Sequence, residues 1–317
     1  MGWPRVGVGF GWLVGAGVAV QGRVNGALGE RLHDGIAAAA VSFVLGLGLL
    51  GVVFAVSGRL RAGVRLVWVA VRDGTLRWWH LLGGLCGAFF VACQGLTVAV
   101  VGVTAFTVAV VAGQLTSSVL VDRLGLGPGG RTPVTAMRLG GAGLALVAVV
   151  ISALGRTDRT DSPDDSLLHG IPAALLIVLP ALSGMSLAWQ QAMNGRVGAV
   201  GGPLSATLMN FLGGTVALIA VESPVVAAQG LPTRPPTEPW LYLGGLLGVT
   251  FIALAALVVR RIGVLLLGLA SVAGQLSTAL VLDLVFPSGS GLPVAAVLGC
   301  ALTLVAVLVA ARRPASQ

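Results

Sequence analysis

The chain has 317 residues, of which 56% are hydrophobic and only 9% are charged, and its mean hydropathy is +0.98. This composition excludes an ordinary water-soluble domain, because such a domain carries many more charged residues on its surface. The formal net charge is +8, and all 19 basic residues are arginines. They gather in the connections between apolar runs, which is typical of a membrane protein and gives no indication of a nucleic-acid partner.

Apolar runs long enough to form membrane-spanning helices recur along the whole chain. A helix needs about 20 apolar residues to cross a hydrocarbon core of about 30 Å. The runs lack the alternating polar and apolar positions of barrel strands. We therefore predict an all-α membrane protein with ten transmembrane helices, at residues 4–28, 36–57, 79–98, 102–121, 135–154, 169–195, 203–221, 240–259, 262–282 and 293–311.

The distribution of arginine predicts the orientation of these helices. With the N-terminus in the cytoplasm, fourteen arginines fall on the cytoplasmic side and five fall outside, in agreement with the positive-inside rule. An even number of spans then returns the C-terminus to the cytoplasm. The predicted location is a cytoplasmic membrane that the chain crosses many times, with both termini inside.

The second half of the sequence repeats the first. The phrase AGQLTSSVLVD at 112–122 returns as AGQLSTALVLD at 273–283, and WHLLGGLCGAFF from Trp79 returns as WLYLGGLLGVTF from Trp240. The polar and aromatic residues of the predicted spans recur in the same order. The first set is Gln21, Asn25, Ser42, Phe43, Gln114 and Asp122, and the second is Gln190, Asn194, Asn210, Phe211, Gln275 and Asp283.

Each half contains five predicted spans, and an odd number reverses the direction in which the second half enters the membrane. We therefore predict two inverted five-helix repeats, at residues 1–155 and 169–317, joined by a polar external linker at 156–168. Inverted repeats are a recurring plan of secondary transporters, whose binding site lies near the middle of the membrane between the halves. A residue that serves access from one side then has a counterpart that serves the other.

The order of these motifs carries a family resemblance. Q-x3-N is followed by S/N-F-x2-G, then by W-x3-GG-x2-G, and then by AGQL with an aspartate eight residues after the glutamine. This order resembles the drug/metabolite transporter superfamily, and most closely its bacterial YdcZ-like branch, whose longer members are fused five-span halves. The resemblance covers nearly the whole chain. It implies an EamA-like, ten-helix carrier of the bacterial inner membrane, with the fifth and tenth helices at the periphery of a central cavity.

The sequence lacks the motifs of several kinds of enzyme and binding site. The absence of lysine excludes a Walker A phosphate loop and a Schiff-base enzyme. His33, His80 and His169 have no metal-binding spacing. We therefore predict no catalysis, no cofactor and no metal. Small multidrug relatives rely on a glutamate in the first span, which this chain lacks, so an amide-lined cavity favours a neutral or zwitterionic solute.

The duplicated amides are the candidate substrate-pathway residues. Gln114, Ser118 and Asp122 follow one another at intervals of four and share a helix face. Gln21 and Asn25 are also one turn apart, and a first helix that loosens at the glycines beside them would expose backbone carbonyls to a central site. Duplication fits either substrate contact or a structural joint between helices. The full predicted pathway is Gln21, Asn25, Ser42, Phe43, Gln94, Gln114, Ser118, Gln190, Asn194, Asn210, Phe211, Gln275 and Thr278.

Three further polar residues have particular positions. Gln94 has no polar counterpart in the second half and is a candidate source of asymmetry. Asp122 and Asp283 end their helices, where a negative charge opposes the helix dipole. They are interpreted either as a gate at the membrane face or as structural bonds to a facing loop.

The sequence therefore favours a secondary transporter, and in direction an exporter, of small polar metabolites or drugs by alternating access. Its expected partners are a small-molecule substrate of unknown identity and the lipid bilayer, without nucleic acid, in a monomer or homodimer. One alternative is an integral membrane protein that binds or assembles without transport. A membrane-embedded enzyme or lipid scramblase is a third, for which the sequence offers no catalytic cluster.

Overall fold

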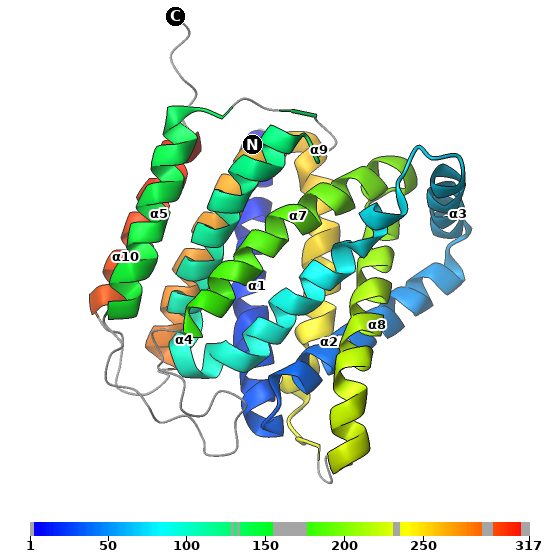
Figure 1. Ribbon diagram of the computed structural model, residues 1–317, viewed down its shortest axis with the longest axis horizontal. Coiled ribbons are helices and arrows are strands. Elements are labelled where there is room, and N and C mark those ends of the chain that lie inside the picture. The colour runs from blue at the N-terminus through cyan, green and yellow to red at the C-terminus, as the bar shows by residue number, and fades with distance from the viewer. Residues whose placement is uncertain are drawn as a thin grey trace, which may run out of the picture.

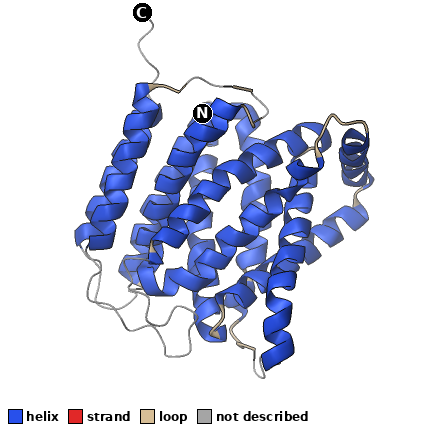
Figure 2. Ribbon diagram, in the orientation of Figure 1, coloured by secondary structure: helices blue, strands red, loops and turns tan. Residues whose placement is uncertain are grey.

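The computed structural model describes residues 3–127, 130–131, 134–154, 176–230, 235–286 and 294–311. Within these residues the chain is helical and contains no strand (Figure 2). The predicted linker at 156–168 and His169 lie outside the described residues. The helices in chain order are α1 (Trp3–Leu32), α2 (Gly35–Val56), α3 (Gly58–Arg72), η1 (Trp78–Leu82), α4 (Gly83–Leu124), α5 (Ala136–Leu154), α7 (Val178–Gly201), α8 (Pro203–Gln229), η2 (Pro239–Tyr242), α9 (Gly244–Val285) and α10 (Val294–Ala311).

Two long helices each cover a pair of predicted spans. α4 includes most of 79–98 and all of 102–121, and α9 does the same for the matching pair in the second half. Gly102 divides α4 into two arms, because its φ of 75° and ψ of 160° are not helical. Glycine adopts such a positive φ without the steric penalty of a side chain. The two arms meet in a sharp bend (Figure 1).

α3 is a helix that the sequence analysis assigned to a connection. Its start is capped by Ser57, whose Oγ accepts a hydrogen bond from the backbone N–H of Leu60. Its packed face meets the end of α7 and the start of α8, where a side chain at Gly63 would overlap the carbonyl oxygen of Gly201. The prediction missed it because α3 is amphipathic and too short and too charged to form a span.

The helices of the two halves lie against each other. α1 packs along α9 and α7 packs along α4, while α2 contacts α8. α5 and α10 pack side by side at one edge of the molecule, and α3 lies at the opposite edge (Figure 1). The core therefore lies where α1, α2 and α9 meet α4, α7 and α8.

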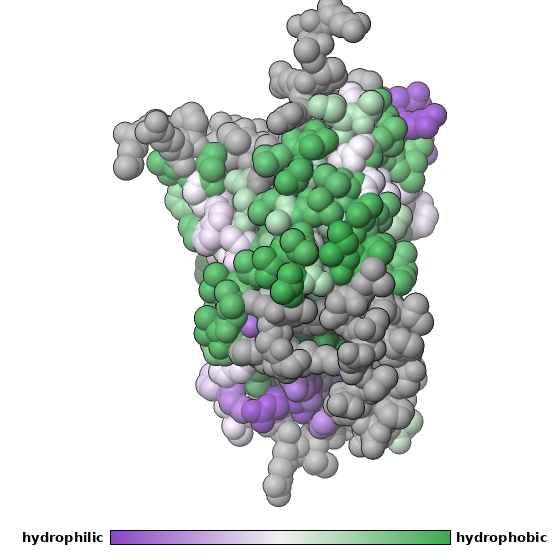
Figure 3. Space-filling view, turned by 90° about the vertical axis from the view of Figure 1, so that its left-hand side faces the viewer, coloured by the Kyte–Doolittle hydropathy of each residue, from purple (hydrophilic) through white to green (hydrophobic). Residues whose placement is uncertain are grey.

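Among the described residues, three helical segments are long and apolar enough to cross a membrane: Gly35–Val56, Trp78–Leu124 and Pro203–Ala228. Shorter apolar helical segments cover parts of α5, α9 and α10. The edge formed by α5 and α10 carries a broad apolar band (Figure 3), and exposed side chains such as Leu146 and Leu308 contribute to it. Apolar helices with apolar outward faces are expected of a protein whose solvent is lipid.

Candidate functional site

Close contacts between the halves occur in matched pairs. A side chain added at Gly15 in α1 would overlap the carbonyl oxygen of Ser271 in α9, and one at Gly184 in α7 would overlap that of Val110 in α4. Gly15 and Gly184 occupy equivalent positions in the two repeats, as do Ser271 and Val110. Two more matched pairs of backbone contacts are Gly274 on Trp12 with Gly113 on Ala181, and Gly245 on Ser42 with Gly84 on Asn210. In a further matched pair, Gly244 lies against the side chain of Asn25 and Gly83 against that of Asn194.

The amides predicted to line the pathway fit into glycine notches of the opposite half. Gln21 Nε2 occupies the space above Gly248 in α9, and Gln190 Nε2 occupies the space above Gly87 in α4. The W-x3-GG-x2-G motif supplies these notches, because glycine leaves room for an amide where any side chain would collide with it. The Q-x3-N motif of each half therefore contacts the W-x3-GG-x2-G motif of the other half.

The first-half amides form a buried hydrogen-bonded network. Gln21 Nε2 donates to the carbonyl oxygen of Gly244 at 2.8 Å. Asn25 Nδ2 donates to Gln94 Oε1 at 2.7 Å, and Ser42 Oγ donates to Asn25 Oδ1 at 2.7 Å. All four polar side chains are buried. The bonds of Asn25 join α1, α2 and α4 within the first half, and the bond of Gln21 reaches α9 of the second half.

The second half has a less complete counterpart. Gln190 and Asn210 are buried and Asn194 is half-buried. The position equivalent to Gln94 is Ala255, so the second set lacks the amide that pairs with Asn25 in the first. The lack of a polar counterpart to Gln94 thus makes the two sets of amides unequal.

Two amide nitrogens in this region are buried without a hydrogen-bond partner among the described residues. They are Gln94 Nε2 and Asn210 Nδ2. Gln94 is 0% exposed and Asn210 is 2% exposed. An unsatisfied buried donor destabilises a fold by about 1–3 kcal/mol, so both are sites where a hydrogen-bond acceptor would be stabilising.

Phe43 and Phe211 meet where α2 crosses α8. Their ring centroids are 4.9 Å apart, with an interplanar angle of 35°. Each ring also covers a glycine of the other helix, since Phe43 lies over Gly214 and Phe211 lies over Gly46. These two predicted pathway residues therefore form an aromatic contact between the halves.

The remaining predicted pathway residues lie away from this network. Gln114 and Ser118 are half-buried in the second arm of α4, where Ser118 Oγ donates to the carbonyl oxygen of Leu115 at 2.8 Å. Gln275 and Thr278 are half-buried in α9. The structure brings the backbone of Gln275 next to Gly15 of α1. Among the described residues, no hydrogen bond joins Gln114 or Gln275 to the network around Asn25.

The two predicted aspartates end α4 and α9. Asp283 is buried, and its carboxylate accepts hydrogen bonds from the backbone N–H groups of Val103 at 3.0 Å and Thr104 at 2.8 Å. These N–H groups begin the second arm of α4, directly after the bend at Gly102, and have no acceptor within their own helix. Asp122 is half-buried in the last turn of α4.

One expectation about α1 is wrong. The helix was expected to loosen at the glycines beside Gln21 and Asn25, but it is continuous from Trp3 to Leu32. Gly22 and Gly26 instead allow close packing, because a side chain at Gly26 would collide with Val98 of α4. Their small size serves helix approach and leaves the backbone carbonyls bonded.

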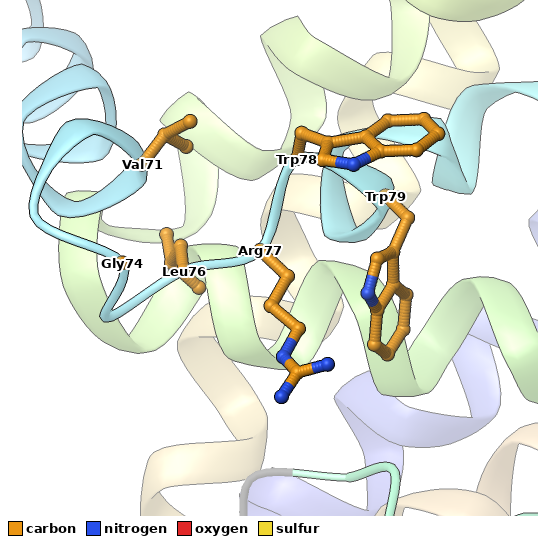
Figure 4. Close-up of a pocket in the computed structure, with 6 residues that line it drawn as sticks. All are labelled: Val71, Gly74, Leu76, Arg77, Trp78 and Trp79. Atoms are coloured by element: carbon orange, nitrogen blue, oxygen red, sulfur yellow. The ribbon is translucent and has the colours of Figure 1, made fainter.

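Sequence reasoning also missed a surface pocket and an arginine. The pocket, of about 340 Å³, opens between the end of α3 and η1 and is lined by Val71, Gly74, Leu76, Arg77, Trp78 and Trp79 (Figure 4). Arg196 of α7 donates to the carbonyl oxygens of Gly125 and Leu126. An arginine directly after the QQAMNG motif was the available signal, because helix C-termini expose unpaired carbonyls.

Comparison with known proteins places the chain in a family. The family model described as "Putative inner membrane exporter, YdcZ" matches residues 6–151 and 175–309. One solved structure, described as "Crystal structure of protein", is similar over 96% of this chain and 95% of its own, with 17% sequence identity and a TM-score of 0.53. This likeness concerns the fold alone. No curated protein matches the chain.

The two matched segments cover most of both halves, and their helices are apolar and cross-packed as a membrane carrier requires. The family is one of transporters rather than enzymes. The resemblance predicted from the repeated motifs is confirmed: the chain belongs to the YdcZ family of inner membrane exporters within the drug/metabolite transporters, in a form that joins two family segments.

Proposed function

We propose that this protein exports small polar solutes across the cytoplasmic membrane by alternating access between two inverted five-helix repeats, residues 1–155 and 169–317. The observation that carries the proposal is the reciprocity of the contacts between amides and glycines. Gln21 lies against Gly248 of the second half, and Gln190 lies against Gly87 of the first. Such exchange is what two repeats related by a two-fold axis produce.

Reciprocal contacts also supply a mechanism for alternation. When equivalent helices cross at equivalent glycines, one half can tilt against the other so that contacts opened near one face have counterparts that close near the other. Crossings at which a glycine meets backbone, such as Gly15 on Ser271 and Gly184 on Val110, permit such sliding because no side chain interlocks there. The two end states then have similar contacts and similar free energies, as a carrier needs.

The unpaired donors support a substrate class. Gln94 Nε2 and Asn210 Nδ2 are buried near the crossing of the halves, and neither has an acceptor among the described residues. A solute with carbonyl, carboxylate or hydroxyl oxygens would satisfy them when the core opens to admit it. The buried network is built from amides and a hydroxyl, which favours a neutral or zwitterionic solute over a lone cation.

The test combines ligand binding with transport. Purified protein is screened by thermal unfolding against amino acids, sugars, nucleosides and organic cations, and the stabilising solutes are then tested for flux in proteoliposomes. Gln94→Met keeps the length of the side chain but removes both the unpaired Nε2 donor and the Oε1 acceptor of Asn25, and Ser223→Ala, near the exposed end of α8, is the control. We expect Gln94→Met to fold and to lose most of the solute-induced stabilisation and flux, with Ser223→Ala unchanged.

Two outcomes would contradict this reading. If no solute class stabilises the wild type or moves across proteoliposomes, the non-transporting membrane protein becomes the better account. If Gln94→Met transports as well as the wild type, the buried amides act as a joint between helices and the solute binds elsewhere. If the wild type and Gln94→Met transport a solute equally well, the transport function stands but the site assigned to Gln94 does not.

A further inference from the structure

α3 presents three distinct faces. One face is packed, because Val67 and Ala70 are buried against α7 and α8. A second face is apolar but exposed. Ala62, Leu66 and Val69 follow one another at intervals of four and three residues, and all three are exposed. Leu66 and Val69 are each 55% exposed. Side chains at this spacing share one side of a helix.

The third face is cationic. Arg65 and Arg72 are seven residues apart, two turns along the helix, and both are exposed. They lie beside the apolar face, because positions 65 and 69 are one turn apart along the helix, as are 69 and 72. The ion pair that the described residues contain joins Arg31 to Glu238, so the α3 arginines have no carboxylate partner there. Asp73 is the one acid between Ser57 and Leu82.

Arg61 differs from the other arginines of α3. Its guanidinium donates to the carbonyl oxygens of Phe54 and Ala55 at the end of α2. This contact satisfies carbonyls that α2 leaves unpaired and fixes the angle between α2 and α3. Arg61 is therefore a structural residue, and the cationic face available to a partner consists of Arg65 and Arg72. Arg59 is also exposed, in the first turn of α3 and on the other side of the apolar face.

An open pocket adjoins the C-terminal end of α3. Arg77 lies at its rim and the rings of Trp78 and Trp79 form one wall, while Val71 and Leu76 form the other side (Figure 4). Trp78 is 67% exposed. A cation, two indoles and apolar side chains in one hollow match the boundary between phosphate groups and acyl chains, where tryptophan and arginine are enriched.

We propose that α3 and the adjoining pocket form a docking surface for the headgroups of anionic phospholipids. The arginines would contact phosphate oxygens, and Leu66, Val69 and Trp78 would enter the outer acyl region. This pairing of exposed apolar and cationic faces is the pattern of helices that lie in a membrane interface. Charge complementarity selects anionic over zwitterionic lipid.

The surface belongs to one half of the protein. In the second half, the connection between Glu222 and Trp240 contains a single arginine, Arg234, against five between Ser57 and Trp78. This surface is therefore not part of the architecture that the two halves share. It gives the first half an attachment to lipid that the second half does not copy.

The test measures lipid binding by the full-length protein in detergent. Native mass spectrometry counts bound dioleoylphosphatidylglycerol and dioleoylphosphatidylcholine, and thermal unfolding follows the stabilisation that each lipid gives. The variant is Arg65→Gln/Arg72→Gln, and the charge-matched control is Arg123→Gln/Arg131→Gln, which removes two exposed arginines near the end of α4. We expect the α3 variant to lose about tenfold or more in phosphatidylglycerol affinity, while the control keeps it.

A salt titration of the wild type tests the proposal without any variant. Raising the salt concentration to about 0.5 M should weaken retention of phosphatidylglycerol and leave that of phosphatidylcholine unchanged. The proposal is overturned if the α3 variant and its control bind phosphatidylglycerol equally. It is also overturned if soluble glycerol phosphate occupies the site as tightly as the lipid, or if the surface instead pairs two copies of the chain and Leu66→Ser abolishes a dimer.

Discussion

Asp283 at the end of α9 caps the helical arm that begins near Thr104 in α4. Its Oδ2 accepts a hydrogen bond from the backbone N–H of Thr104 at 2.8 Å, and its Oδ1 accepts one from Val103 at 3.0 Å. The carboxylate therefore lies at the N-terminus of a half-helix, where the dipole favours negative charge. The end of α9, in the second half, therefore lies on the bend of α4 in the first half.

Removal of this cap should destabilise the protein measurably. We expect Asp283→Ala to lower the free energy of unfolding by about 2 kcal/mol, because it leaves two buried N–H groups without acceptors. Asp283→Asn should lose less, since its side-chain oxygen still accepts one bond. Thermal unfolding in detergent measures both, with the exposed Asp73→Asn as control. An Asp283→Ala protein as stable as the wild type would show that water replaces the cap.

The bend in α4 depends on a glycine. Gly102 has φ 75° and ψ 160°, a conformation that residues with a Cβ adopt at a penalty of about 1–3 kcal/mol. We expect Gly102→Ala to lower the unfolding temperature. Gly48→Ala, in α2, is a matched control because an added Cβ there meets nothing within 4 Å and alanine favours helix. Equal unfolding temperatures for Gly102→Ala and Gly48→Ala would mean that the bend is not fixed by this residue.

The glycine notches should be sensitive to a single methyl group. A Cβ at Gly244 would collide with Asn25 Oδ1 and Ser42 Oγ, and one at Gly83 would approach Asn194 Oδ1. We expect both alanine variants to lose stability and solute flux, with Gly244→Ala the more severe. The reason is that Asn25 is held in a network and is fully buried, whereas Asn194 is half-buried.

Measurement of the two variants uses thermal unfolding and proteoliposome flux, beside Gly143→Ala in α5, where an added Cβ has open space. If Gly83→Ala is the more damaging of the two, the contact of Gly244 with the bonded side chains of Asn25 and Ser42 is not the dominant joint between the halves.

The proposed orientation can be mapped by chemical labelling. Thr75 lies in the exposed connection after α3, and Glu238 lies before η2. In a variant without native cysteines, we expect Thr75→Cys to be labelled from the cytoplasmic side and Glu238→Cys from the outside by a membrane-impermeant thiol reagent. The arginine bias between the two faces is the reason. Labelling of both positions from the same side would contradict the ten-span topology.

The sequence by itself determined the class of protein and the order of its parts. Length of apolar runs, arginine in the connections and the doubled QxxxN, GGxxG and AGQL motifs are local patterns, and they led to a helical membrane protein of the YdcZ family, which is confirmed. These local patterns could not reveal α3. A short amphipathic helix has too many charges to be predicted as a membrane span and too few turns to be predicted as a separate element.

The tertiary structure decided which of the repeated residues touch. Asn25 and its partner Gln94 are 69 residues apart, and Asp283 and Thr104 are 179 residues apart. Nothing in the spacing along either helix indicates such partners, because they depend on how deeply the helices approach one another. That approach is set by glycines at the crossings, where the loss of a side chain on one half makes room for an amide on the other.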